Sequence, residues 1–354
     1  MSHVFRELLQ KVGSGTHTHK DLTRAESAAA TRMILQQEAT PAQIGAFMIA
    51  HRIKRPNGDE LAGILDAYED LGPKLQPINS DRPVTILSNP YDGRSRTAPI
   101  SPLTALILAA ADCPVVMHGG DRMPTKYGVP LVELWQGLGV DWQRLSLEQS
   151  QQSLETIGIG FVYLPNHFPL AQQIVPYRDQ IGKRPPFATA ELFWAPYAGS
   201  AQIAVGYVHP PTEGMAQQTF ALRSTPRFLT VKGLEGSCDL PRDRTGIVGV
   251  HRSAEEPIER LLLHPRDYGL DGTDVPLPPF SDLIASYQRV LAGEPSEMMR
   301  SVVWNGGFYL WQAGACSDLS AGLEVAATLL SEGTVADTLT RLTTQVQDMT
   351  QAPI

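Results

Sequence analysis

The sequence predicts an α/β protein built from a small all-helical domain and a larger α/β domain with a mainly parallel central sheet. Three observations support this prediction. The first eighty residues show helical periodicity and no Val/Ile-rich alternating strand. After Pro83, short apolar runs bounded by Gly, Pro or Asn alternate with helical stretches. A chain of 354 residues is also long enough for two domains.

Residues 1–80 are expected to form the N-terminal helical domain. Apolar residues recur there at helical spacing, so that each segment hides one stripe. Gly72 and Pro73 mark the end of the last helix. Two pairs have capping-box spacing and predict helix starts, the second with a proline at the favoured first helical position: Thr23 with Glu26, and Thr40 with Gln43.

The α/β domain is expected at residues 83–165 and 197–354. Between its two parts, residues 166–196 return to a helical pattern and are expected to join the N-terminal domain. Residues 252–280 are rich in proline and charge, which predicts a long surface excursion. Strands are predicted at 84–88, 113–118, 158–164, 201–208 and 227–233, and helices at 102–111, 130–138, 281–292, 296–315, 318–332 and 334–348.

Composition limits the classes of function. A formal net charge of −8 argues against a wholly basic nucleic-acid binder, although it leaves room for a local basic groove. The three cysteines show no CxxC spacing, which is typical of reduced thiols, so a cytoplasmic location is expected. The N-terminus lacks a long apolar core, and the longest apolar run, at 103–111, is too short to cross a bilayer, so no membrane partner is expected.

Four stretches resemble, in order, motifs of the anthranilate phosphoribosyltransferase family. They are MHGGDRMPTKYG (117–128), GIGFVYLPNHFP (158–169), VPYRDQIGKRPPF (175–187) and VVWNGGFYLWQAGACSDLSAGLEVAATLLSEG (302–333). Together with the helical N-terminus, this similarity covers nearly the whole chain. It implies the nucleoside phosphorylase/phosphoribosyltransferase-like fold and a homodimer formed through the N-terminal helices. The family transfers ribose 5-phosphate from phosphoribosyl pyrophosphate to an aromatic amine, with Mg²⁺ bridging the phosphates.

The family's diphosphate loop, GTGGDGxxTFNIST, corresponds here to SNPYDGRSRTAPIS (88–101). Proline and tyrosine replace glycines, which removes an N–H group and hinders close approach of the backbone to a phosphate. Two gained arginines supply positive charge instead. The alternative is an ordinary solvated βα loop. The residues expected to bind an anion are Asp92, Gly93, Arg94, Arg96 and Ser101.

The second matched loop adds His118, Gly119, Arg122 and Lys126 to the expected anion-binding set. Arginine and lysine are the side chains that most often face phosphate, the lysine as a mobile point charge. For His118 the alternative is a histidine whose hydrogen bonds are satisfied at the end of a strand.

Two further positions concern the metal and the acceptor. The family's metal-binding Asp-Glu pair aligns with Cys238 and Asp239 in VKGLEGSCD (231–239). A thiol is a poor Mg²⁺ ligand, so the Mg²⁺ site that the resemblance implies is expected to be degraded, with Asp239 and the nearby Glu235 as the remaining candidate ligands. Arg178 aligns with the arginine that contacts the acceptor carboxylate. Its alternative role is an ion pair on a helix surface.

Two functions of different class follow. The first is an anthranilate phosphoribosyltransferase-like protein that binds a phosphorylated ligand in the cleft between the domains. It would transfer a phosphoribosyl group to an acceptor. The acceptor is left unidentified because the segment after Arg178 lacks the family's glycine and asparagine. The second is a non-catalytic homodimer that binds DNA or RNA on the same fold, which the resemblance to a divergent branch of the family implies. A binder of that kind loses affinity steeply with salt.

Overall fold

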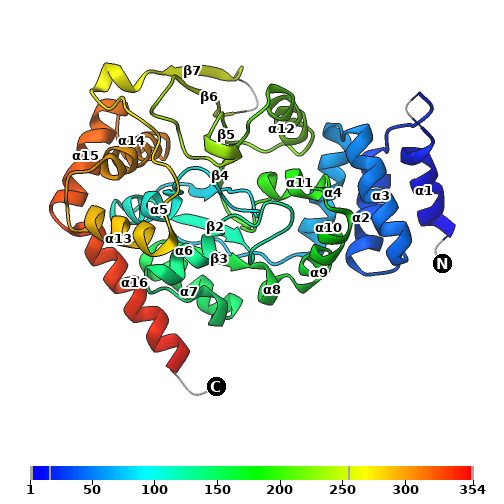
Figure 1. Cartoon of the computed structure of the whole chain (residues 1–354), viewed down its shortest axis with the longest axis horizontal. Coiled ribbons are helices and arrows are strands. Elements are labelled where there is room, and N and C mark those ends of the chain that lie inside the picture. The colour runs from blue at the N-terminus through cyan, green and yellow to red at the C-terminus, as the bar shows by residue number, and fades with distance from the viewer. Residues whose placement is uncertain (1–2, 16, 254–255, 352–354) are drawn as a thin grey trace.

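The computed structural model describes residues 3–15, 17–253 and 256–351. Figure 1 shows the N-terminal helices (blue) at one end of the molecule and the sheet with its flanking helices at the other. The helices of the 166–196 region (green) lie between these two parts. This is the predicted architecture of a small helical part and a larger α/β part, and the prediction is confirmed.

Four helices form the N-terminal part: α1 (His3–Gly13), α2 (Arg24–Leu35), α3 (Pro41–Lys54) and α4 (Gly58–Leu71). Both predicted capping boxes are present, at the starts of α2 and α3. A third, which pairs Asn57 with Glu60, begins α4. Each box satisfies N–H groups that the first turn of a helix leaves without partners.

The 166–196 region folds into short helices: α8 (Leu164–His167), α9 (Pro169–Gln172), α10 (Val175–Ile181) and α11 (Phe187–Phe193). α10 packs against α3, and α11 packs against α4. Phe168, Phe187 and Trp194 surround the buried ring of Tyr68 from α4. Aromatic packing therefore joins this region to the N-terminal helices.

A seven-stranded sheet has the order β3-β2-β1-β4-β5-β6-β7. The first five strands in this order are parallel, and β6 and β7 are antiparallel additions at one edge. The strands are β1 (Val84–Leu87), β2 (Val115–Gly119), β3 (Ile159–Tyr163), β4 (Ala201–Gly206), β5 (Phe228–Val231), β6 (Gly246–His251) and β7 (Glu259–Leu263). β7 lies inside the predicted surface excursion. Its sequence ERLLL ends in three leucines, but the strand lies at the edge of the sheet and its side chains are mostly exposed.

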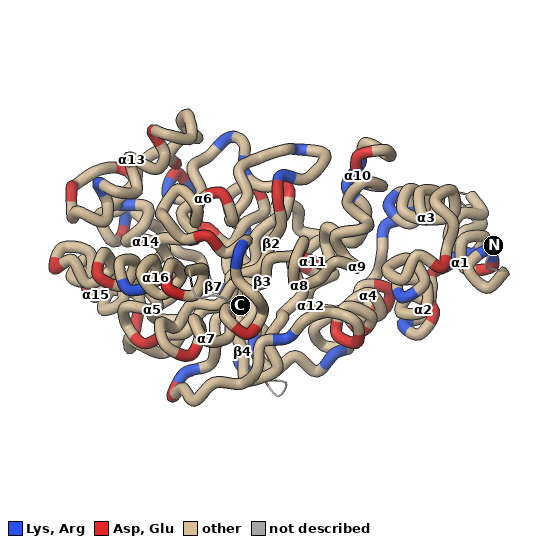
Figure 2. The backbone as a smooth tube through the Cα atoms, turned by 90° about the horizontal axis from the view of Figure 1, so that it is seen from below, with Lys and Arg blue, Asp and Glu red and all other residues tan. Residues whose placement is uncertain are grey.

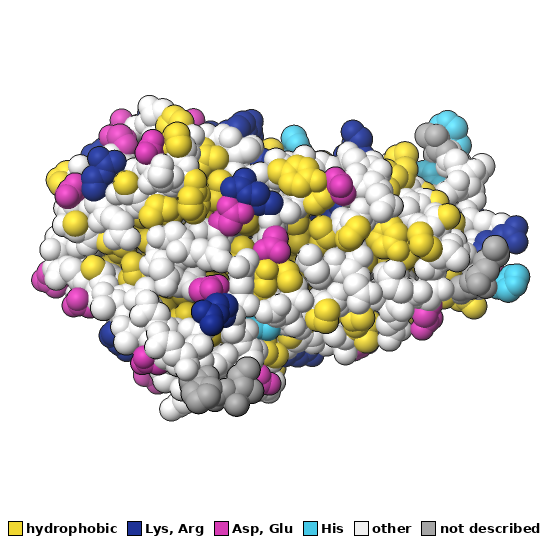
Figure 3. Space-filling model, turned by 60° about the horizontal axis from the view of Figure 1, so that its bottom comes forward, with side chains coloured by type: hydrophobic (Ala, Val, Ile, Leu, Met, Phe, Trp, Pro, Cys, Tyr) yellow, Lys and Arg dark blue, Asp and Glu magenta, His cyan; other side chains and the backbone are white. Residues whose placement is uncertain are grey.

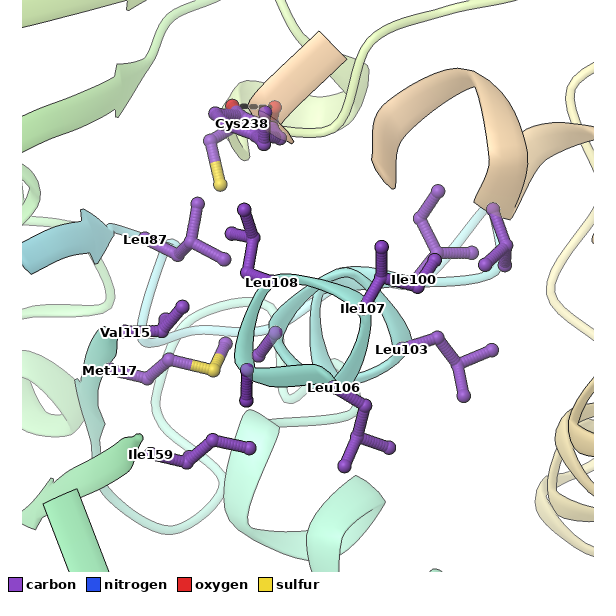
Figure 4. Close-up of a cluster of buried hydrophobic side chains, with 14 of the residues drawn as sticks. Leu87, Ile100, Leu103, Leu106, Ile107, Leu108, Val115, Met117, Ile159 and Cys238 are labelled. Atoms are coloured by element: carbon purple, nitrogen blue, oxygen red, sulfur yellow. Dashed lines mark hydrogen bonds between the residues drawn. The ribbon is translucent and has the colours of Figure 1, made fainter. Parts of the chain in front are cut away.

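Helices flank the sheet: α5 (Ser101–Ala110), α6 (Leu131–Gly137), α7 (Leu147–Ile157), α12 (Pro210–Leu222), α13 (Phe280–Leu291), α14 (Glu297–Gln312), α15 (Leu319–Ser331) and α16 (Thr334–Gln351). Short 3-10 helices lie at Trp142–Arg144, Leu234–Gly236 and Pro265–Tyr268. α5 is apolar on all sides and packs against α14 and α16 as well as the sheet. Figure 4 shows its leucines and isoleucines among side chains from β1, β2 and β3. In the described part of the chain, no helix is both long and apolar enough to span a membrane.

Candidate functional site

A cleft of about 460 Å³ opens between the two parts of the molecule. Its floor is made by loops that follow the carboxyl ends of the parallel strands β1, β2, β4 and β5. Its opposite wall is formed by the end of α3 and by residues 184–192. Parallel α/β sheets bind their ligands at this edge, near the point where the strand order reverses. Here the reversal lies between β1 and β4.

The lining of the cleft carries more positive than negative charge. Five cationic side chains line it, namely Arg52, Arg96, Lys126, Arg178 and Arg184, against the three carboxylates of Asp92, Glu191 and Glu235. Figure 2 shows Lys and Arg positions at the end of α3, on the side toward α10. In Figure 3, by contrast, Lys and Arg lie beside Asp and Glu and form no broad basic face on that side. The excess of positive charge is therefore a local property of the cleft.

Glu235 reaches into the loop that corresponds to the diphosphate loop. Its carboxylate accepts hydrogen bonds from the backbone N–H groups of Ser95 (3.3 Å), Arg96 (3.0 Å) and Thr97 (2.9 Å). The Thr97 hydroxyl donates at 2.9 Å, and Lys126 Nζ lies 2.6 Å away. Burial opposes ionisation of Glu235. The bonds from Lys126, Thr97 and Arg96 nevertheless hold its pKa well below the usual range.

Arg94 and Asp239 form an ion pair beneath the same loop. Arg94 is 2% exposed and Asp239 is 1% exposed. The guanidinium donates to Asp239 Oδ2, and the Ile100 N–H donates to the same oxygen at 3.1 Å. The Ser101 hydroxyl donates to Oδ1 at 2.8 Å. Both carboxylate oxygens of Asp239 therefore have partners from the protein itself.

The donors at the family's metal position do not fit Mg²⁺. Asp239 is bound by Arg94, and Glu235 is bound by Lys126 and by N–H groups. Figure 4 shows the Cys238 sulfur directed toward Leu87 and Leu108, and burial raises the pKa of this thiol. In the described part of the chain, no three His, Cys, Asp or Glu side chains gather around a common point. Mg²⁺ prefers several free oxygen ligands in octahedral geometry, which these residues do not offer.

Arg178 lines the cleft, but its guanidinium is already paired. It donates from Nη1 to Glu191 Oε2 at 3.0 Å and also pairs through Nη2 with Oε1. Both residues are buried. Glu191 stands where the family motif has a glycine. Its carboxylate binds the two guanidinium N–H groups of Arg178 that an acceptor carboxylate would need.

His118 and Gly119 lie at the end of β2 and are buried. The Tyr91 hydroxyl is 2.5 Å from His118 Nδ1, and the imidazole packs edge-on against Trp194. Burial lowers the pKa of His118 to about 3, so the ring is neutral near pH 7. Neither residue lines the cleft. This placement does not fit the anion-binding role expected for His118, and it fits the alternative of a histidine held inside the protein.

Gly93 has a structural task. Its φ is 71°, and a Cβ atom there would lie 2.5 Å from the carbonyl carbon of Gly128. The two loops are joined at this point, where Gly128 N–H donates to Asp92 O at 2.9 Å. Only glycine fits such a close approach. Asp92 itself lines the cleft, 3.2 Å from Arg184 Nη1.

Other predicted residues are placed as follows. Arg96 is at the rim of the cleft with its side chain 77% exposed. Arg122 pairs with Glu133 and does not line the cleft. The anion-binding set from the sequence omits Arg52 and Arg184, which both line it. Arg184 is visible as part of the KR pair in a matched motif, whereas Arg52 reaches the cleft only because α3 packs against α10.

Comparison with known proteins agrees with this geometry. Residues 6–72 match the model of the glycosyl transferase family helical bundle domain, and residues 92–336 match that of its a/b domain. The chain belongs to this glycosyl transferase family. The second match alone spans more than half of the sequence, and the two segments correspond to the helical and α/β parts of the fold.

Among the relatives in this family are anthranilate phosphoribosyltransferases. The one from Paracidovorax citrulli is 27% identical over 348 residues, which covers 97% of each chain. The one from Polynucleobacter necessarius is 26% identical over 320 residues, or 89% of this chain and 91% of the relative.

Solved structures show the same fold. The anthranilate phosphoribosyltransferase from Thermus thermophilus superposes with a TM-score of 0.78 at 20% identity, covering 98% of this chain and 100% of that one. The Saccharomyces cerevisiae enzyme in complex with PRPP and Mg has a TM-score of 0.82 at 14% identity, covering 98% and 99%. At these identities the likeness concerns the fold alone.

Proposed function

We propose that this protein binds a phosphorylated ligand in the cleft between its helical and α/β parts. The observation that supports the proposal is the excess of positive charge on the lining, together with three exposed arginines at the rim: Arg52, Arg96 and Arg184. Among the described residues, Arg52 has no carboxylate within ion-pair distance, and its guanidinium donates to the Arg184 carbonyl at 2.7 Å. Arginine suits phosphate because its planar fork donates two parallel hydrogen bonds.

Phosphoribosyl pyrophosphate is the first ligand to test, because a solved relative of the same fold is described in complex with it. The reaction that such a ligand supports is phosphoribosyl transfer to an acceptor other than anthranilate. Arg178 does not favour an acceptor carboxylate, since Glu191 already binds its guanidinium. The rim arginines would stabilise negative charge on the departing diphosphate.

Isothermal titration calorimetry with phosphoribosyl pyrophosphate tests the binding. The expected result is an affinity that falls as salt rises from 50 to 300 mM and that drops about tenfold in an Arg184→Ala variant. Arg122→Ala is the matched control, because this arginine pairs with Glu133 outside the cleft. Equal losses in both variants, or no binding at millimolar ligand, would contradict the proposal.

A second candidate is a non-catalytic binder of DNA or RNA. It is favoured by exposed cations that continue from the cleft along the end of α3 and the turn after α10: Arg52, Arg55, Lys183 and Arg184. A single-stranded oligonucleotide of about 20 nucleotides is the probe. Fluorescence anisotropy should then show binding whose affinity declines linearly with the logarithm of salt concentration. A titration without salt-sensitive binding would remove this candidate.

We further propose a homodimer that forms through the N-terminal helices. α1 and α3 share an apolar hollow of about 720 Å³ lined by Leu9, Val12, Ile49 and Ile53, and Ile53 is 75% exposed. An exposed apolar patch of this kind is typical of an interface. A second copy would bury it by pairing the same helices. The cytoplasmic location stays a prediction from the cysteine pattern.

A further inference from the structure

Glu235 is held by a set of donors that would also suit a phosphate. Three consecutive backbone N–H groups, one hydroxyl and one ammonium group converge on its carboxylate at 2.6–3.3 Å. Successive N–H groups in a turn, supplemented by a lysine, form the nest in which proteins bind phosphate groups. The loop therefore keeps an anion-binding geometry, although proline and tyrosine replace the glycines before it.

The backbone that delivers Glu235 is fixed in place. Glu235 has φ 54°, a left-handed conformation that residues with a Cβ atom rarely adopt. A Cβ atom on Gly206 would lie 2.1 Å from Ser237 O, and one on Gly233 would lie 2.0 Å from the same oxygen. The segment is thus wedged against the end of β4. Its side chain is 3% exposed although Glu235 lines the cleft, because the surrounding donors cover the carboxylate.

We infer that Glu235 is a built-in substitute for a ligand phosphate, and that it decides which phosphorylated ligands the cleft takes. With Glu235 in the nest, a diphosphate can approach only the rim arginines. Without Glu235, the same N–H groups and Lys126 become a site for inorganic pyrophosphate. This inference goes beyond the proposed function, because it concerns a nest that the rim ligand does not need.

The alternative is that Glu235 only fastens the loop and that nothing else fits its place. A Glu235→Gly variant separates the two. Glycine adopts a positive φ without strain, so this variant keeps the backbone course while it removes the side chain with its carboxylate. Glu133→Ala is the matched control, since it also removes one negative charge and frees one cation, Arg122, but leaves no nest.

Calorimetry with inorganic pyrophosphate at constant ionic strength gives the readout. Glu235→Gly should bind pyrophosphate on the order of tenfold or more tightly than the wild type, because hydrogen bonds to a charged group are strong. Glu133→Ala should match the wild type. Equal affinities for all three proteins would overturn the inference.

Two further measurements cover a loss of stability and a failure of the proposed function. If Glu235→Gly unfolds more readily, millimolar pyrophosphate should raise its melting temperature by several degrees more than that of the wild type. No such difference would contradict the inference. Arg184→Ala should weaken rim binding about tenfold, as above, yet the gain in pyrophosphate affinity should persist in a Glu235→Gly/Arg184→Ala double variant. If Glu235→Gly gains affinity for pyrophosphate but the wild type does not bind phosphoribosyl pyrophosphate, only the proposed function is refuted. If the wild type binds phosphoribosyl pyrophosphate but Glu235→Gly gains no affinity for pyrophosphate, only this inference is refuted.

Discussion

Replacing Arg94 by methionine should destabilise the protein by about 3–5 kcal/mol, which is the usual effect of removing one partner of a buried ion pair. The variant leaves Asp239, 1% exposed, with a buried charge and no cation beside it. The remaining donors are the Ile100 N–H at 3.1 Å and the Ser101 hydroxyl at 2.8 Å. These two bonds do not replace the guanidinium. The loss should therefore fall inside this range.

Equilibrium urea unfolding, followed by tryptophan fluorescence and circular dichroism, measures the change. Arg96→Met is the matched control in the same loop. Its side chain is 77% exposed, so the expected change is within about 0.5 kcal/mol. Adding Asp239→Asn to Arg94→Met removes the unpaired charge and should recover at least half of the loss. A destabilisation of under about 1 kcal/mol for Arg94→Met would refute the view that Asp239 is held as an ion-pair partner.

Three other predictions concern pH and assembly. Burial opposes ionisation of Glu60, yet His51 and Lys54 hold its pKa at about 2. Its contribution to stability is complete above about pH 4.5 and is lost as the pH falls toward 2, so Glu60→Gln should flatten that part of a urea-unfolding pH series. Burial lowers the pKa of His118 to about 3, so the unfolded chain binds a proton at this residue more readily than the folded protein does. The free energy of unfolding should therefore fall by about 1.4 kcal/mol for each unit by which the pH drops from 6 to 4, and His118→Asn should lack this slope. In light scattering the wild type should have the mass of the proposed dimer and Ile53→Asp that of a monomer, and equal masses would contradict the proposed interface.

The sequence predicted the elements that depend on local pattern. The capping boxes of α2 and α3 are present, and the five parallel strands lie within the five predicted runs or within a residue of them. Both depend on residues a few positions apart. β6 and β7 were not predicted. β6 (GIVGVH) is a mostly buried apolar run of the same kind as the predicted strands, so its signal was present and was missed. β7 is an exposed edge strand whose hydrogen bonds come from β6. An edge strand with mostly exposed side chains, such as β7, has neither a buried apolar run nor a clear alternation to reveal it.

The ion pairs of the site could not be predicted from the sequence. The cations Arg94 and Lys126 were identified, but the carboxylates that bind them were not paired with them. Asp239 lies 145 positions from Arg94, and Glu235 is 138 positions from the Thr97 N–H that it accepts. Contacts at such separations are set by the order of strands in the sheet. Counting the cations of each loop separately therefore overestimates the positive charge that is free to bind a ligand.

The carboxylates at the family's metal position bind the protein's own cations and leave an excess of positive charge elsewhere in the cleft. The most direct measurement is a calorimetric titration of the full chain with phosphoribosyl pyrophosphate, with and without 5 mM Mg²⁺, at matched ionic strength. We expect salt-sensitive binding with the same affinity in both series. Binding that is tenfold or more tighter with Mg²⁺, or that requires it, would contradict the claim.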